Sequence, residues 1–249
     1  MTKANSIISP YALPSPDARF EEQYITARRR ENRMYSDTEV SRLPRIPKSH
    51  MHAAEWKIRS RSSKRLVHYL ENKHVPLNLL EVGCGNGWLS NRLSEMKYST
   101  VTGIDISKTE IIQAQRVFPE KSNLQFAAGD MQSISYAMKF DVLVFAASVQ
   151  YFFPLEELIE DALLRLKENG EIHILDSYFY CPADRESARH RSRIYYQSIG
   201  QEEMADFYFH HSAESLKRFH CKYLYNPKDF RNKILGRKDP FPWIRIQRP

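Results

Sequence analysis

Residues 79–90 read LLEVGCGNGWLS and place three of the chain's eight glycines, Gly83, Gly85 and Gly87, within five positions. An apolar run ends in this stretch, and a helical pattern begins at its end. Glycine permits left-handed backbone angles and lets a ligand approach the main chain without a Cβ in the way. The stretch therefore predicts a strand-to-helix turn that binds a nucleotide cofactor, with a turn needed only for packing as the alternative.

Short apolar runs alternate with helical patterns from residue 77 to residue 180, which is typical of parallel strands joined by crossover helices. After Pro154, apolar residues recur at steps of three and four, and this spacing predicts a helix that Asn169 and Gly170 end. The predicted parallel strands are 77–82, 99–104, 124–127, 140–146 and 171–177, and an antiparallel hairpin is predicted near 219–225 and 243–247.

The flanks of this alternating section carry less regular patterns. A Pro- and Ser-containing arm precedes an amphipathic helix, and a second helix is expected to end near Asn72. The predicted organisation is an arm over 1–17 and a helix over 20–35 within an N-terminal lid (1–50), followed by a Rossmann-like domain (51–249) with its cofactor core at 77–180 and an acceptor lid region at 178–215.

Carboxylates around the glycine turn indicate which cofactor it binds. Glu81 precedes the first glycine and suits a ligand cation such as the ammonium of a methionine moiety, whereas Trp88 stands where a dinucleotide fingerprint needs a small residue. Asp105 ends the second strand, where a carboxylate accepts ribose hydroxyl protons. Asp130 and Met131 follow the third strand and combine a polar partner for an adenine amine with apolar contact for its ring.

Together with Gly129-Asp130, Phe140-Asp141 and the turn at 168–171, these features make residues 79–180 resemble the class I S-adenosylmethionine-dependent methyltransferase domain. The resemblance implies a doubly wound α/β fold with a mostly parallel seven-stranded sheet, S-adenosylmethionine as cofactor and S-adenosylhomocysteine as product. The cofactor-binding residues it implies, with two from the upstream helix, are Glu81, Gly83, Cys84, Gly85, Gly87, Asp105, Ile106, Asp130, Met131, Ala147, Trp56 and Arg59.

A hydroxyl acceptor also needs a base, and the candidates are Asp176 and His210. Asp176 comes at the carboxyl end of the fifth strand, where α/β sheets place their ligands, although a structural carboxylate is the alternative. His210 and the adjacent His211 belong to a less regular region, where surface or core roles compete. Residues 178–209 interleave aromatic side chains with four arginines and suit an acceptor lid, or an ordinary packing layer: Arg185, Arg189, Arg191 and Arg193.

The formal charge of +7 is unevenly distributed over the 249 residues. Residues 1–78 hold 15 basic against 8 acidic side chains, residues 79–180 hold 8 against 14, and residues 181–249 hold 14 against 8. Basic flanks around an acidic core attract a nucleic acid or another anionic partner, or form a solvated surface. Three widely spaced cysteines favour neither a disulfide framework nor a paired-cysteine zinc site, and no metal ligand is assigned.

The sequence thus predicts a cytoplasmic enzyme with no membrane span that methylates a small molecule, by O-methylation of a carbohydrate or another secondary metabolite. One alternative is an RNA or protein methyltransferase that docks through its basic flanks, with nucleic acid the less favoured partner. Another is a non-catalytic relative that binds the cofactor. The sequence does not specify the acceptor, the methylated atom or the oligomeric state.

Overall fold

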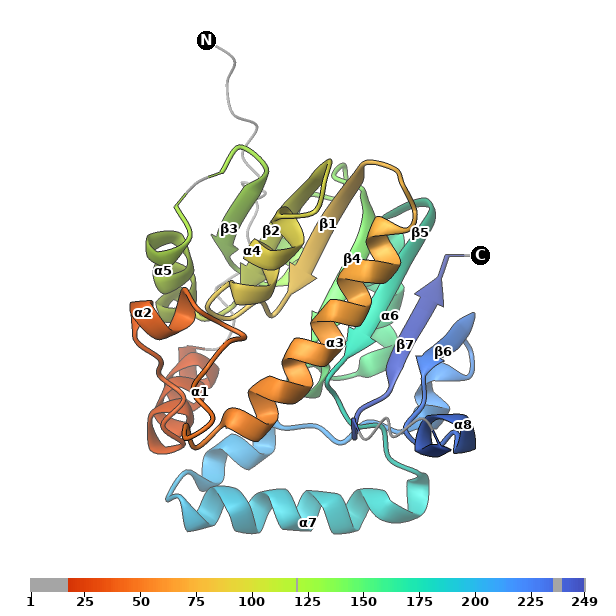
Figure 1. The fold of residues 1–249 in the computed structure, drawn as a ribbon. Helices are drawn as coiled ribbons and strands as arrows, with labels where there is room; N and C mark the ends of the chain where they lie inside the picture. The colour runs from red at the N-terminus through yellow and green to blue at the C-terminus, as the bar shows by residue number, and fades with distance from the viewer. Residues whose placement is uncertain (1–17, 120, 235–238, 249) are drawn as a thin grey trace.

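A seven-stranded sheet lies at the centre of the computed structural model, which describes residues 18–119, 121–234 and 239–248 (Figure 1). The predicted arm over 1–17 falls outside the described residues. The strand order is β3-β2-β1-β4-β5-β7-β6, with β1 to β5 parallel and the last two strands antiparallel. The strands are β1 (Leu77–Val82), β2 (Ser99–Asp105), β3 (Leu124–Ala128), β4 (Phe140–Ala146), β5 (Leu166–Leu175), β6 (Cys221–Tyr225) and β7 (Trp243–Gln247).

Helices cover both faces of this sheet and also the edge where its parallel strands end. On one face pack α3 and α4, and on the other α6, whereas α1 and α7 lie beyond the carboxyl ends of the parallel strands (Figure 1). The helices are α1 (Ala18–Arg30), α2 (Asp37–Val40), α3 (Ala53–Glu71), α4 (Trp88–Ser94), α5 (Lys108–Val117), α6 (Leu155–Leu164), α7 (Pro182–Ser198) and α8 (Phe230–Ile234), with 3₁₀ turns η1 (Met131–Ser133), η2 (Val149–Tyr151), η3 (Glu202–Phe207) and η4 (Ala213–Leu216).

Two apolar layers hold the sheet because successive strand residues face opposite sides. Leu79 and Val142 pack with α3 and α4, whereas Leu80 and Leu143 pack with α6. All four side chains are at most 1% exposed. Strands buried on both faces explain why the sequence shows continuous apolar runs rather than polar alternation. The predicted fold class is confirmed, including the antiparallel C-terminal hairpin.

The connection order creates a crevice between β1 and β4. From β1 the chain moves outward to β2 and β3, and then returns to the other side of β1 as β4. Parallel sheets bind ligands where the strand order reverses, at the carboxyl ends of the strands. Gly83 directly follows β1 and Ala147 directly follows β4, so the predicted cofactor turn stands at this crevice.

The predicted end of the helix after Pro154 is wrong, because α6 stops at Leu164 and β5 already begins at Leu166. The Phe140 N–H donates to the Arg165 carbonyl, and Leu166 pairs with Phe140, so pairing with β4 takes over where the periodicity favoured helix. Asn169 does adopt a left-handed φ of 61°, but within the irregular start of the strand.

The predicted N-terminal helix over 20–35 also ends early, at Arg30, and Tyr35 belongs to the following loop. The Tyr35 hydroxyl accepts a hydrogen bond from Trp56 Nε1 at 2.9 Å, so the loop packs against α3. In the described part of the chain, no helix is long and apolar enough to cross a membrane.

Candidate functional site

The glycine turn after β1 packs directly against the turn after β4. Gly83 has a left-handed φ of 75°, and a Cβ built on it would lie 2.5 Å from the Ser148 Cβ. Ser148 Oγ donates to the Val82 carbonyl at 2.7 Å, which joins the two strand ends. A Cβ on Gly87 would instead meet the Phe126 ring, so this third glycine serves helix packing rather than an approach to the crevice.

Glu81 is a buried acid immediately before this turn. Its side chain is 2% exposed and accepts a hydrogen bond from Ser90 Oγ. Burial raises the pKa of Glu81 to about 8, because an ionised carboxylate loses its hydration there. Glu81 lines a cavity of about 510 Å³ at the crevice, so a ligand cation entering that cavity would favour its ionised form.

The Asp105 carboxylate is engaged by the protein itself, which corrects the expectation that its hydrogen bonds go to a ligand alone. One oxygen accepts from the Gly85 N–H and the other from the Ser107 N–H, each at 2.8 Å. Asp105 therefore ties the glycine turn to the end of β2. Burial raises its pKa in spite of these two bonds. Each carboxylate oxygen has a second lone pair, which leaves acceptor capacity for ribose hydroxyls.

An apolar hollow of about 310 Å³ opens beside Asp105, and several of the predicted cofactor-binding residues line it. The Asp130 carboxylate accepts from the Ser133 N–H at 2.9 Å and thereby caps η1. Met131 packs in the core at 3% exposure, so the structure corrects its predicted position at the adenine ring. The lining residues are Phe20, Tyr24, Val82, Gly83, Asp105, Ile106, Gly129, Asp130, Ala147, Ser148, Tyr151, Phe152 and Phe207.

The larger cavity, called the chamber below, meets the hollow at Gly83, Ala147, Tyr24 and Tyr151, which line both. Trp56, Arg59, Cys84 and Asp176, all predicted site residues, also line the chamber, and so do eight tyrosines: Tyr24, Tyr35, Tyr151, Tyr178, Tyr180, Tyr195, Tyr196 and Tyr208. Four arginines and four acidic residues line it as well: Arg28, Arg33, Arg59, Arg191, Glu31, Glu55, Glu81 and Asp176.

The two predicted bases have different surroundings. Asp176 has a left-handed φ of 53°, accepts from Ser62 Oγ at 2.8 Å, and has its pKa raised by burial. His210 instead lies behind the tyrosines of the chamber wall, against Tyr180 and Tyr208, with its Nε2 at 2.9 Å from Ser192 Oγ. His210, the second predicted base, therefore does not line the chamber.

The adjacent His211 is bonded to the main chain, because its Nε2 lies 2.8 Å from the Val149 carbonyl. Burial lowers the pKa of both imidazoles.

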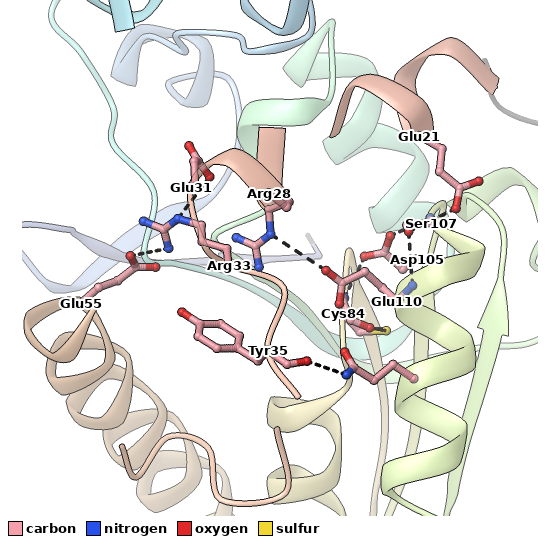
Figure 2. Close-up of polar contacts among 12 residues, drawn as sticks. Glu21, Arg28, Glu31, Arg33, Tyr35, Glu55, Cys84, Asp105, Ser107 and Glu110 are labelled. Atoms are coloured by element: carbon pink, nitrogen blue, oxygen red, sulfur yellow. Dashed lines mark hydrogen bonds and ion pairs between the residues drawn. The ribbon is translucent and has the colours of Figure 1, made fainter. Parts of the chain in front are cut away.

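Polar contacts attach α1 and the residues after it to α3 and to the start of α5, as Figure 2 shows. Glu21 accepts from Ser107 Oγ and the Thr109 N–H, each at 3.2 Å, at the start of α5. Arg28 reaches Glu110 at 3.9 Å. The helical periodicity of this segment contains no signal for these contacts, because their partners lie more than 80 positions away in the chain.

Residues 79–170 match a protein family described as a methyltransferase domain. Residues 79–170 of this chain therefore form a methyltransferase domain. The strand order and the glycine turn at the reversal point agree with that assignment.

Curated relatives match about half of the chain. The malonyl-[acyl-carrier protein] O-methyltransferase of Halalkalibacterium halodurans is 27% identical over 132 residues, which cover 49% of this chain and 49% of that protein. The ubiquinone biosynthesis O-methyltransferase of Pelagibacter ubique is 31% identical over 101 residues, or 39% of this chain and 41% of that protein. The chain thus spans about half the length of the curated relatives it matches.

Solved structures share the fold over most of the chain. A magnesium protoporphyrin IX methyltransferase from Synechocystis, with bound S-adenosylhomocysteine, has a TM-score of 0.57 at 14% identity and covers 90% of this chain and 95% of its own. A plantazolicin methyltransferase in complex with a substrate analogue and S-adenosylhomocysteine has a TM-score of 0.55 at 18% identity, covering 92% and 97%. The methyltransferase domain and its flanking helices therefore follow an established architecture.

Proposed function

We propose that this protein transfers the methyl group of S-adenosylmethionine to an oxygen atom of a small acceptor bound in the chamber. The observation that carries the proposal is the junction of the two cavities at the glycine turn. The hollow combines apolar walls with Asp105 and Asp130, which suits an adenosine. The chamber presents Glu81 and Arg59 beside the same turn, which suits an amino acid zwitterion.

When bound, the cofactor would supply a methyl group on a positively charged sulfur; the acceptor oxygen would take the methyl carbon, the C–S electrons would stay on sulfur to give S-adenosylhomocysteine, and the hydroxyl proton would pass to a base. The protein's part is to align the acceptor and to exclude water. Phe20 and Tyr24 of α1 line the hollow, and Tyr195 and Tyr196 of α7 line the chamber. We assign α1 and α7 as the elements that close over the two ligands, in line with the lid expected within residues 1–50 and the acceptor lid region at 178–215.

Asp176 is the general base in this proposal. It lines the chamber from the carboxyl end of β5, and Ser62 holds its carboxylate by one hydrogen bond. Burial raises its pKa, and a carboxyl with a raised pKa is a stronger base when ionised. The aromatic walls suit a sugar or another secondary metabolite with a hydroxyl group. All six curated relatives matched are named O-methyltransferases, which supports oxygen as the acceptor atom.

The experiment that tests the proposed function is incubation with methyl-labelled S-adenosylmethionine and a fractionated cell extract. We expect label in the small-molecule fraction, where it is present as a methyl ether or a methyl ester. Label in RNA or protein would refute the small-molecule acceptor. Binding of S-adenosylhomocysteine without any transfer to any fraction would favour a non-catalytic role.

A further inference from the structure

Glu55, near the start of α3, joins two arginines of the chamber. Its Oε1 accepts from Nε and Nη2 of Arg59, each at 2.9 Å. Its Oε2 accepts from Nη1 of Arg33 at 2.6 Å, a contact that Figure 2 shows. Burial acts to raise the pKa of Glu55, but the two guanidinium groups outweigh it and lower the pKa to about 2. The carboxylate is therefore ionised throughout the physiological pH range, and both contacts are charge-assisted.

The contacts continue from Arg33 to the helix that covers the chamber. Arg33 Nε lies 3.1 Å from Glu31 Oε2, and Glu31 Oε1 accepts from the Tyr195 hydroxyl of α7 at 2.7 Å. The chain of contacts from Arg59 through Glu55, Arg33 and Glu31 to Tyr195 is called the ion-pair chain below. All five of its members line the chamber, and they come from three separate segments of the sequence.

Arg59 stands between the two halves of the proposed reaction site. Its positive charge lowers the pKa of Glu81, at the glycine turn, and that of Asp176, at the end of β5, against the effect of burial on each. Arg59 lines the chamber, and its bonds to Glu55 use Nε and Nη2 but not Nη1.

We propose that Glu55 is a positioning residue, which holds Arg59 and Arg33 so that their guanidinium groups receive the carboxylate of the cofactor's methionine end. The inference rests on the proposed function. A free arginine loses rotamer entropy when it binds a ligand, and an anchor that fixes the guanidinium beforehand removes that cost from ligand binding. Glu55 reaches no part of the adenosine hollow, so its influence is confined to the amino acid end.

Contacts other than those of Glu55 also anchor α3. The neighbouring Trp56 holds α3 in place, because its ring packs edge-on against Trp88 at 5.3 Å and its Nε1 bonds to Tyr35. Glu55→Gln keeps the shape of the side chain and removes its charge. A matched control is Glu71→Gln, which makes the same change at the exposed last residue of α3, outside the chamber lining.

The test compares two ligands by titration calorimetry. S-adenosylhomocysteine contains the amino acid end, and 5′-methylthioadenosine lacks it. We expect Glu55→Gln to weaken S-adenosylhomocysteine binding about tenfold and to leave 5′-methylthioadenosine binding within about twofold of the wild type, as lost charge-assisted contacts to one group would do. Glu71→Gln should change neither affinity.

An equal loss for both ligands, or no loss for either, would overturn the proposal, because a general structural role does not distinguish them. If Glu55→Gln lowers the melting temperature by more than a few degrees, Glu55→Asp replaces it, because the shorter side chain keeps the charge but draws the carboxylate away from both arginines. This variant must show the same split between the two ligands. Failure of the wild-type protein to bind S-adenosylhomocysteine would instead refute the proposed function, so the two failures are distinguishable.

Discussion

Cofactor binding should depend on pH through Glu81. In the free protein the pKa of Glu81 is raised to about 8, with burial as the largest cause. The carboxyl is then about 1% ionised at pH 6 and about half ionised at pH 8. A ligand ammonium binds the ionised form, and apparent affinity falls with the fraction of competent protein. We therefore expect S-adenosylhomocysteine to bind about fifty-fold more tightly at pH 8 than at pH 6.

The assay is titration calorimetry at three pH values between 6 and 8, in two buffers of different ionisation enthalpy. Wild-type protein should release nearly one proton on binding at pH 6. Glu81→Gln should bind S-adenosylhomocysteine weakly and lose most of the pH dependence of its affinity. As a control, Glu95→Gln makes the same change at an exposed residue directly after α4 and should keep the wild-type pH profile. A wild-type affinity that is constant from pH 6 to pH 8 would refute the placement of Glu81 at the ligand ammonium.

The raised pKa of Glu81 also predicts how the stability of the free protein depends on pH. Because the folded-state pKa of Glu81 lies above its ordinary value of 4.5, its contribution to the free energy of unfolding is fully present below pH 4.5 and is lost as pH rises through 8. The loss amounts to about 3–5 kcal/mol over this window. The free energy of unfolding, measured in urea at pH 5 and at pH 8.5, should decrease less between these two pH values for Glu81→Gln than for the wild type.

Three further changes test other parts of the site. Asp105→Ala should weaken S-adenosylhomocysteine binding by about 1–3 kcal/mol and also lower the melting temperature, because two backbone N–H groups lose their acceptor; a variant with unchanged affinity would remove Asp105 from the ribose. Asp176→Asn should reduce kcat about a hundredfold with S-adenosylhomocysteine affinity unchanged, and a wild-type rate on the identified acceptor would exclude Asp176 as the base. Arg191→Ala should raise KM about tenfold for an anionic acceptor, whereas Arg189→Ala should not, because Arg191 lines the chamber and Arg189 does not contribute to that lining. Equal kinetics for the two arginine variants would show that the arginines of α7 are solvated surface.

The corrected positions of several residues share one cause. Met131 was predicted at the adenine because it follows an acid at a strand end, yet the local pattern does not tell a core side chain from a pocket wall. His210 was predicted near the chamber from its region of sequence, and the fold places tyrosines in front of it. In both cases the side chain lies close to the site, but its direction depends on elements packed from elsewhere in the chain.

Local pattern alone determined the sheet, the crossover helices and the glycine turn at the strand reversal, because apolar spacing and glycine backbone freedom are properties of neighbouring residues. It also placed Glu81 and Asp105 at strand ends. Tertiary structure decided what those groups contact: Asp105 bonds to the glycine turn, and Glu55 joins residues from α3 to α7 through the ion-pair chain. Contacts between distant segments, such as that of Tyr195 with Glu31 across 164 positions, leave no periodic trace in the sequence, since only folding brings their partners together.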